Sequence, residues 1–215
     1  MRTNNNIKTE ITPDQHQIIL GTILGDSSLS MRSENANASL RIKHCDKDKD
    51  YVSWKYEELK SAKLFISSPK ARPGRYKTGT TRSWLLCSRH LPLLTEYYKL
   101  FYPNGIKVVT EGILRELNWL GIAVWYMDDG SRQHSHRRVE RSRVRLAVMG
   151  FTLVEVGVIR RWFWDRYQLL PTVLANKGLL FKVKDSRKFL DSVSPYVEQV
   201  PCMRRKLEER RSGSL

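Results

Sequence analysis

Two long apolar stretches of the chain each end in an acidic residue. ILGTILGDS at residues 19–27 leads to Asp26, and IAVWYMDDG at residues 122–130 leads to Asp129. The density of apolar residues favours two buried helices. A negative charge is unfavourable at the C-terminal end of a helix, where unpaired carbonyl groups already carry partial negative charge. Something else in the protein is therefore expected to offset these two carboxylates.

Other helices are indicated by their start signals and their apolar spacing. A Thr-x-x-Gln capping box at residues 12–15 predicts a first helix that runs to Asp26. A Thr-x-x-Glu box at residues 152–155 predicts another helix that runs through Tyr167. Further helices are expected at 46–63, at 90–101 and from about Ser186 onward.

Several shorter segments alternate between apolar and polar residues, as half-buried strands do. They lie at residues 39–45, 139–149 and 179–185, and 82–87 is a further strand candidate. The segment 69–83 reads as a basic turn or hairpin. The positions predicted to face solvent are basic: Arg41, Lys43, Arg141, Arg143, Arg145, Lys182 and Lys184.

The order of these elements repeats in the second half of the chain. Residues 88–107 resemble residues 186–206, and Ser88 and Ser186 are offset by 98 positions (186 minus 88). Chance could supply some of the matching letters, but the shared order favours duplication. We expect an α+β fold of two pseudo-symmetric αββαββα units with antiparallel sheets, divided into domains at 12–110 and 111–208.

The net charge of the chain indicates which class of molecule it binds. Of 215 residues, 38 are Lys or Arg and 22 are Asp or Glu, which gives a net charge of +16. This excess favours nucleic acid, although a basic ribosomal-type protein has the same balance. Six Trp and nine Tyr argue against a disordered basic tail. The three cysteines lack zinc-site spacing, no apolar run of about 18 residues predicts a membrane span, and MRTNNNIKTE lacks a signal-peptide core.

The two acids suggest a metal site. Gly21 and Gly25 would let the first apolar helix pack closely, and a symmetric pair of such helices would bring Asp26 and Asp129 together. Divalent cations would supply the missing positive charge, and hard oxygen ligands suit Mg²⁺, with Mn²⁺ or Ca²⁺ as substitutes. Alternatively, each aspartate merely ends a helix, with Gly130 as a C-cap of the second.

With these residues in place, the chain resembles the LAGLIDADG homing endonucleases in their single-chain form. The two motifs are ILGTILGDS and IAVWYMDDG, and the resemblance spans residues 12–208. It implies a monomeric, Mg²⁺-dependent endonuclease that cuts double-stranded DNA at a long, nearly asymmetric target and leaves 3′ overhangs. It also implies that the motif helices form the interface between the domains.

The resemblance assigns roles to six residues near the motifs. Asp26 and Asp129 match the acids at the scissile phosphates, the carbonyls of Gly25 and Asp128 would be accessory metal ligands, and Lys107 and Lys206 match the basic residues. Asp128 is an alternative ligand to Asp129. The match is imperfect, because Ser27 replaces a common glycine and Val124 stands where the first motif has Gly21.

Basic strand faces suit the DNA major groove, where arginine can bond guanine through two hydrogen bonds. A solvated charged sheet is the alternative. Loops are expected to carry further DNA contacts: Arg72, Arg75, Tyr76, Lys77, Arg82, Arg132, His134, Arg137 and Arg138. His134 and His136 resemble a zinc-binding pair, but no third ligand is evident.

A binding protein on the same fold is the competing hypothesis. Some members of the family assist the splicing of intron RNA as maturases, and others only regulate transcription. Both acids are present, which favours an enzyme but does not exclude a maturase. No intein splicing residues are seen at the ends, so we expect a free-standing or intron-encoded protein, with an organelle as one expected compartment.

Overall fold

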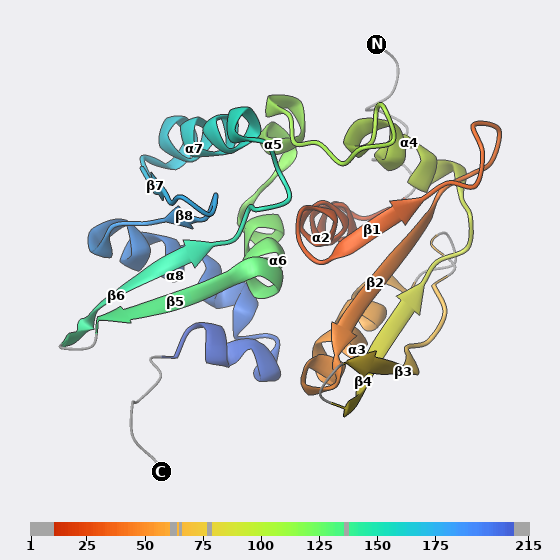
Figure 1. Cartoon of the computed structure of the whole chain (residues 1–215), viewed down its shortest axis with the longest axis horizontal. Helices are drawn as coiled ribbons and strands as arrows, with labels where there is room; N and C mark the ends of the chain where they lie inside the picture. The colour runs from red at the N-terminus through yellow and green to blue at the C-terminus, as the bar shows by residue number, and fades with distance from the viewer. Residues whose placement is uncertain (1–10, 61–63, 65, 77–78, 136–137, 209–215) are drawn as a thin grey trace. The chain divides into compact units, whose positions relative to one another are not determined.

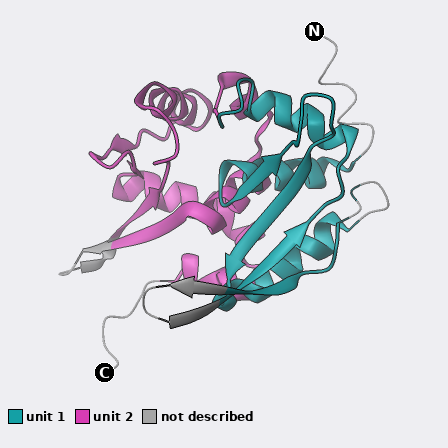
Figure 2. Cartoon of the chain, turned by 45° about the vertical axis from the view of Figure 1, so that its right-hand side comes forward, with its two compact units in different colours: residues 1–107 teal, residues 108–215 magenta. Residues whose placement is uncertain are grey.

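The computed structural model describes residues 11–60, 64, 66–76, 79–135 and 138–208. The chain forms two compact units, Met1–Lys107 and Val108–Leu215 (Figures 1 and 2). None of the helices within the described ranges is long and apolar enough to cross a membrane.

Unit 1 has the predicted αββαββα order. Its elements are α2 (Pro13–Leu24), β1 (Ser27–Ser30), β2 (Ser39–Cys45), the 3₁₀ turn η1 (Asp46–Asp48), α3 (Lys49–Leu59), β3 (Lys70–Tyr76), β4 (Gly79–Cys87) and α4 (Pro92–Phe101). The four strands form one antiparallel sheet in the order β1-β2-β4-β3. The helices bury one face of this sheet, and the alternation along β2 is clean: Leu40, Ile42 and His44 are buried between exposed neighbours.

Unit 2 repeats this order and adds a short helix in front. Its elements are α5 (Glu111–Glu116), α6 (Trp119–Asp129), β5 (Gly130–Ser135), β6 (Arg138–Leu146), α7 (Leu153–Tyr167), β7 (Thr172–Val173), β8 (Leu179–Leu180), α8 (Val183–Val197) and the 3₁₀ segment η2 (Pro201–Lys206). The sheet order β5-β6-β8-β7 matches that of unit 1. The predicted fold class is therefore confirmed.

Equivalent residues of the repeat make equivalent contacts. The hydroxyl of Ser88 accepts a hydrogen bond from the backbone N–H of Leu40 in β2 at 2.8 Å. The hydroxyl of Ser186 accepts one from the N–H of Val144 in β6 at 2.9 Å. Each serine satisfies a buried backbone donor beside the central strands, so the matching letters have a shared structural cause.

Both predicted capping boxes are present. Thr12 and Gln15 exchange hydrogen bonds at the start of α2, and Thr152 and Glu155 do so at the start of α7. Burial raises the pKa of the Glu155 carboxyl, but hydrogen bonds from Thr152 and from the N–H of Val109 outweigh it, so the pKa lies below its ordinary value. The ionised carboxylate thus ties the segment before α5 to the start of α7.

The prediction of a strand at 179–185 is wrong beyond its first two residues. β8 ends at Leu180, and α8 begins at Val183 with Lys182 as its N-cap. The buried residues of α8, namely Ser186, Phe189, Val193 and Val197, are spaced by three or four positions. This helical period continues over fifteen residues and prevails over a short stretch of alternation.

Three strands lie where the sequence analysis assigned none. β1 and β5 directly follow the apolar helices, and β7 has only two residues. The hairpin alternative for the basic segment 69–83 is confirmed, because β3 and β4 pair as a hairpin. The loop expected around Arg132 and Arg138 is largely strand, because β5 pairs with β6.

The two apolar helices end differently. α2 ends at Leu24, so the first helix is two residues shorter than predicted, and Asp26 follows the cap residue Gly25. α6 continues through Asp129 and is capped by Gly130. Ser27 and Gly130 nevertheless occupy matching places, because each pairs with the central strand of its own sheet.

Gly130 is required by space and not by its backbone angles. Its φ of −81° and ψ of 152° suit any residue. A Cβ atom there would lie 1.9 Å from the ring of Tyr126 and 2.4 Å from the Tyr126 carbonyl oxygen. In unit 1 the residue at the place of Tyr126 is Ile23, and Ser27 donates its hydroxyl hydrogen to the carbonyl of Thr22 at 2.7 Å.

We therefore expect Gly130→Ala to lower the free energy of unfolding by about 1–3 kcal/mol or more, because an added methyl group collides with a fixed ring and carbonyl. Gly157→Ala is the matched control. Nothing lies within 4 Å of that position in α7, so a gain of about 0.5–1 kcal/mol from helix propensity is expected. Urea unfolding of both variants measures the difference, and equal stabilities would contradict this account.

Candidate active site and nucleic-acid interface

Asp26 lies just beyond the C-terminal end of α2. Its side chain is 47% exposed and comes from the short link between Gly25 and β1. The side chain of Lys107, at the end of unit 1, donates to the carbonyls of Leu24 at 3.4 Å and Gly25 at 3.2 Å. A lysine ammonium therefore lies at the helix end, where positive charge is favourable.

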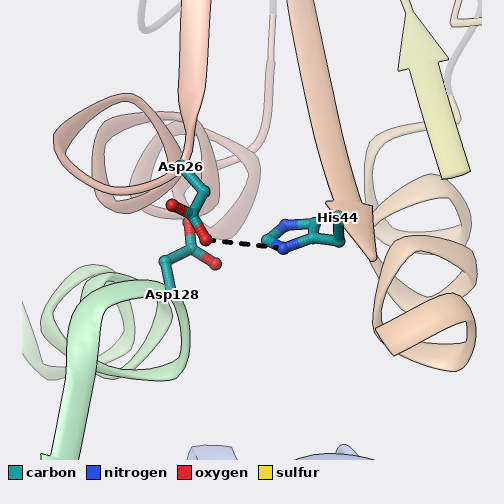
Figure 3. A group of neighbouring side chains, drawn as sticks. All are labelled: Asp26, His44 and Asp128. Carbon is teal, nitrogen blue, oxygen red and sulfur yellow. Dashed lines mark ion pairs between the residues drawn. The ribbon is translucent and has the colours of Figure 1, made fainter. Parts of the chain in front are cut away.

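His44 adds a second group beside this acid. It is buried on β2, and its Nδ1 lies 3.6 Å from an oxygen of Asp26 (Figure 3). The sequence analysis missed His44. A signal was available, because the alternation of 39–45 places His44 on the same face as Leu40 and Ile42, where a polar side chain needs a reason.

Lys55 stands behind His44. It belongs to α3, its residue exposure is 0%, and its Nζ lies 3.3 Å from His44 Nε2. The same Nζ is 4.4 Å from the centre of the Tyr51 ring, which is a cation–π distance. Asp26, His44 and Lys55 thus form a chain of polar groups that runs from the surface into the core of unit 1.

In unit 2, Asp128 and Asp129 are the last two residues of α6, and both are partly exposed. Figure 3 draws Asp128 on this helix. The main chain of Asp129 is anchored to the sheet, because its carbonyl accepts from the N–H of Ala147 at 3.1 Å. Lys206 Nζ donates to the carbonyl of Gly130, the next residue, at 2.5 Å.

Tyr126 holds Lys206 in place from within α6. Its hydroxyl donates to the Lys206 carbonyl at 2.8 Å. Burial raises the pKa of the Tyr126 hydroxyl well above its ordinary value, an effect that the nearby Arg132 only partly opposes. The hydroxyl therefore stays protonated and remains a donor. In each unit, a lysine from the end of the repeat reaches the end of the apolar helix.

Basic side chains occupy the outward positions of both sheets. Arg41 and Lys43 are exposed on β2. Arg143 is exposed and Arg145 partly exposed on β6, between the buried Ser142, Val144 and Leu146. Arg72 on β3 is exposed on the outward face of its own sheet as well. Arg82 on β4 is exposed, but it pairs with Pro73 and therefore lies on the opposite face from Arg72, which pairs with Ser83. The predicted alternation of β6 is therefore present between residues 142 and 146.

Arg132 does not lie in a loop. It is in β5 opposite Val144, on the buried side of the sheet. Its guanidinium donates to the carbonyl of Leu207 and to the hydroxyl of Ser142. The predicted loop placement of Arg132 is therefore wrong, because the pairing of β5 with β6 directs its side chain to the buried side. Its predicted DNA contact stays a prediction.

Lys182 and Lys184 are exposed, but they belong to the start of α8 and not to a sheet face, which corrects their predicted placement. Lys77, His136 and Arg137 lie outside the described residues. Only the backbone is described for a further group, which lies in β3, β5 and β6: Arg75, Tyr76, His134, Arg138 and Arg141. Their predicted contacts stay predictions, and so does the assignment of the acids and lysines.

The family model described as the LAGLIDADG DNA endonuclease family matches residues 16–189 of the chain. Among solved structures, the homing endonuclease I-WcaI bound to its DNA recognition sequence is similar, with a TM-score of 0.81 and 19% identity. The alignment covers 98% of this chain and 94% of that one. At this identity the likeness shows the fold.

The curated proteins that this chain resembles include proteins named RecA and an mRNA maturase. The chain is 27% identical to Protein RecA of Mycolicibacterium chitae over 94% of its own length and 48% of that protein. The chain thus spans about half the length of the first curated relatives it matches. It is 23% identical to the cytochrome b mRNA maturase bI2 of Debaryomyces hansenii over 94% of its length and 76% of the maturase.

Replacing an arginine on the buried side of the sheet and one on its outward face should affect stability and DNA binding differently. We expect Arg132→Ala to lower the free energy of unfolding by about 1.5–3 kcal/mol, because it removes hydrogen bonds made by a charged group. Arg143→Ala, on the outward face of the same sheet, should change stability by less than about 0.5 kcal/mol and weaken DNA binding by about 1–3 kcal/mol. Urea unfolding and a DNA titration measure the two effects, and the reverse pattern would contradict a buried role for Arg132 and an outward role for Arg143.

Proposed function

The chain belongs to the LAGLIDADG DNA endonuclease family, and from this we propose that it is a metal-dependent, site-specific endonuclease that cuts both strands of a DNA duplex. One observation carries the proposal. Each unit ends a buried apolar helix with an exposed or partly exposed aspartate, Asp26 or Asp129, and brings a lysine ammonium to the same helix end.

The donor atoms at these ends suit Mg²⁺. Carboxylates of Asp26 and Asp129 and main-chain carbonyls of Gly25 and Asp128 are hard oxygen ligands, which Mg²⁺, Mn²⁺ and Ca²⁺ prefer over nitrogen or sulfur. A carbonyl oxygen has two lone pairs, so the bond from Lys107 to Gly25 leaves it able to accept a second partner. When bound, such an ion would polarise the phosphodiester and help to deprotonate a water.

Lys107 and Lys206 are proposed to act on the phosphate. Their ammonium groups are held by main-chain carbonyls, which fix their position without neutralising their charge. A preorganised ammonium can stabilise the negative charge that develops on a phosphate in the transition state. The same lysines also offset the helix dipoles, so their stability effect and their catalytic effect have to be measured separately.

The outward sheet faces are proposed to bind the DNA. The described candidates on these faces are Arg41, Lys43, Arg72, Arg143 and Arg145. Arg82 is exposed on the opposite face of β4. It is carried as a sequence prediction, as are Arg75, Tyr76, Lys77, Arg132, His134, Arg137, Arg138 and Arg141. Two-stranded ribbons of this width fit the major groove, and a repeated basic face would repel itself without an anionic partner. A long target, 3′ overhangs and action as a monomer follow from the family resemblance.

A maturase role is the second candidate, favoured by the similarity to the cytochrome b mRNA maturase. In that case intron RNA is the partner, and an organelle is the proposed compartment. The two activities can coexist in one chain. Cleavage of a DNA duplex and stimulation of intron splicing in vitro are separate assays, and each acid variant below can be run in both.

The function is tested with a target selected from random duplexes by binding in EDTA. Wild-type protein is expected to cut this target in Mg²⁺ and not in EDTA. Asp26→Asn and Asp129→Asn should each slow cleavage on the order of 10²-fold or more while keeping specific binding, because they remove an anionic ligand at nearly constant size. Uncut target in Mg²⁺, or wild-type rates in both variants, would refute the proposal.

The lysines are tested strand by strand. We expect Lys107→Met and Lys206→Met each to slow one DNA strand by about 10²-fold more than the other, and the favoured strand to differ between the two variants. End-labelled duplexes report the two strands separately, and a supercoiled plasmid should accumulate as nicked circle. Thermal unfolding of the same variants supplies the stability effect. Equal slowing of both strands in both variants would leave the lysines with a structural role alone.

A further inference from the structure

A buried polar pair lies behind the acid of unit 1. His44 faces Asp26 through Nδ1 (Figure 3), and its other ring nitrogen lies 3.3 Å from Lys55 Nζ. The imidazole comes from β2 and the ammonium from α3, so the pair joins the sheet to the helix that covers it. Both side chains are buried, whereas the carboxylate that they lead to is exposed.

Lys55 determines which nitrogen of His44 carries the proton. An ammonium has three donors and no acceptor, so His44 Nε2 must be the acceptor of their 3.3 Å contact. The ring is then neutral, and its single proton is on Nδ1. The Nδ1 atom faces the Asp26 carboxylate, and the nitrogen–oxygen distance of 3.6 Å is longer than a hydrogen bond.

The repeat allows this pair to be compared with unit 2. Ile42 pairs with Ser27 as Leu146 pairs with Gly130, which sets an offset of 104 between β2 and β6 (146 minus 42). The same offset relates the N-cap residues of the following helices, Asp48 of α3 and Thr152 of α7.

At this offset, His44 corresponds to Val148 and Lys55 to Ile159. Both unit 2 residues are buried, with exposures of 2% and 0%. The neighbouring positions agree as well, because Val52 and its counterpart Val156 are both buried. One copy of the fold therefore fills these two places with an apolar pair, and the other copy fills them with an imidazole and an ammonium.

The polar pair needs a reason beyond packing. Moving an ammonium and an imidazole out of water is unfavourable by several kcal/mol before their contacts are counted, whereas valine and isoleucine gain from burial. Unit 2 shows that the same fold forms with apolar residues at these two positions. The group that the polar pair faces is Asp26, which the proposed function places at the chemistry.

We propose that His44 is a positioning residue for Asp26, and that Lys55 fixes the ring of His44 so that its Nδ1–H holds the carboxylate in the orientation needed to bind a divalent cation. The inference rests on the proposed function. In unit 2, Val148 and Ile159 occupy the positions equivalent to His44 and Lys55. The two acids are therefore supported by different means, and the acid of unit 1 depends on a histidine.

Removing a partner that orients a metal-binding carboxylate typically costs 10–100-fold in metal affinity or activity. We expect His44→Val to raise the Mg²⁺ concentration for half-maximal cleavage by about this factor, with specific DNA binding unchanged in EDTA. His44→Asn should stay close to wild type, because its amide nitrogen can occupy the place of Nδ1 and donate. Val148→Ala, which removes buried volume at the equivalent position of unit 2, is the matched control and should not change the Mg²⁺ requirement.

The double variant His44→Val/Lys55→Ile copies the pair of unit 2 into unit 1. It should fold with a melting temperature at or above that of His44→Val, because it no longer buries an ammonium beside a missing imidazole. It should show the same raised Mg²⁺ requirement as His44→Val. This variant keeps the test decisive if His44→Val alone does not fold.

A measurement without metal, DNA or turnover tests the arrangement itself. In ¹⁵N-edited spectra at a pH where the ring is neutral, His44 should show the Nδ1–H tautomer in the wild-type protein. Lys55→Met, which keeps the length of the side chain but removes the donor, should populate the Nε2–H tautomer. An unchanged tautomer in Lys55→Met would overturn the role of Lys55.

The outcomes separate this inference from the proposed function. If wild-type protein cuts no target, the function fails, while the tautomer spectra still decide whether Lys55 fixes His44. If wild-type protein cuts its target but His44→Val and Val148→Ala have the same Mg²⁺ requirement, the function stands and the positioning role of His44 is wrong.

Discussion

An aspartate at the C-terminal end of a buried helix is the constraint on which the site depends. The last carbonyls of a helix have no partners in the helix and repel an anion. In unit 1, several donors bind carbonyl oxygens at this helix end. The N–H of Gly25 donates to Gly21, the hydroxyl of Ser27 donates to Thr22, and Lys107 donates to Leu24 and Gly25. These bonds satisfy the helix end, and the lysine adds a positive charge beside Asp26. The carboxylate can then remain exposed at a place where it would otherwise be destabilising.

Unit 2 meets the same constraint with different contacts. Relative to its acid, α6 is two residues longer than α2, so Asp129 is still helical, and its carbonyl accepts a hydrogen bond from Ala147 next to β6. Lys206 binds the carbonyl of Gly130, and Tyr126 binds the carbonyl of Lys206. A large aromatic ring at position 126 then excludes any side chain at position 130. The glycine and the tyrosine therefore form a matched pair. In unit 1, Ile23 and Ser27 occupy the two places, and the Ser27 hydroxyl donates to the carbonyl of Thr22.

Sequence patterns predicted the features that rest on local rules. The capping boxes at Thr12 and Thr152 and the alternation around Val144 appear as expected, because each depends on residues a few positions apart. The serine-rich strands β1 and β5 were missed because their strand character comes from pairing with a neighbour and not from their own residues. Arg132 shows the limit most clearly. From the sequence alone, Arg132 cannot be distinguished from outward-facing basic residues such as Arg143. The pairing of β5 with β6 nevertheless places its side chain on the buried side, where it binds Ser142.

Duplication within one chain explains why the two halves can differ while the fold stays the same. In a dimer of identical subunits, a change at one acid would also occur at the other, so both sites would share its effect. When two copies are linked in one chain, a residue can change in one copy and not in the other. Unit 1 can therefore have the polar His44 and Lys55 at two buried positions where unit 2 has the apolar Val148 and Ile159. A polar group in one of two equivalent core positions is thus a physical marker of specialised chemistry, and it is visible only when the internal repeat is aligned by strand register and not by matching letters.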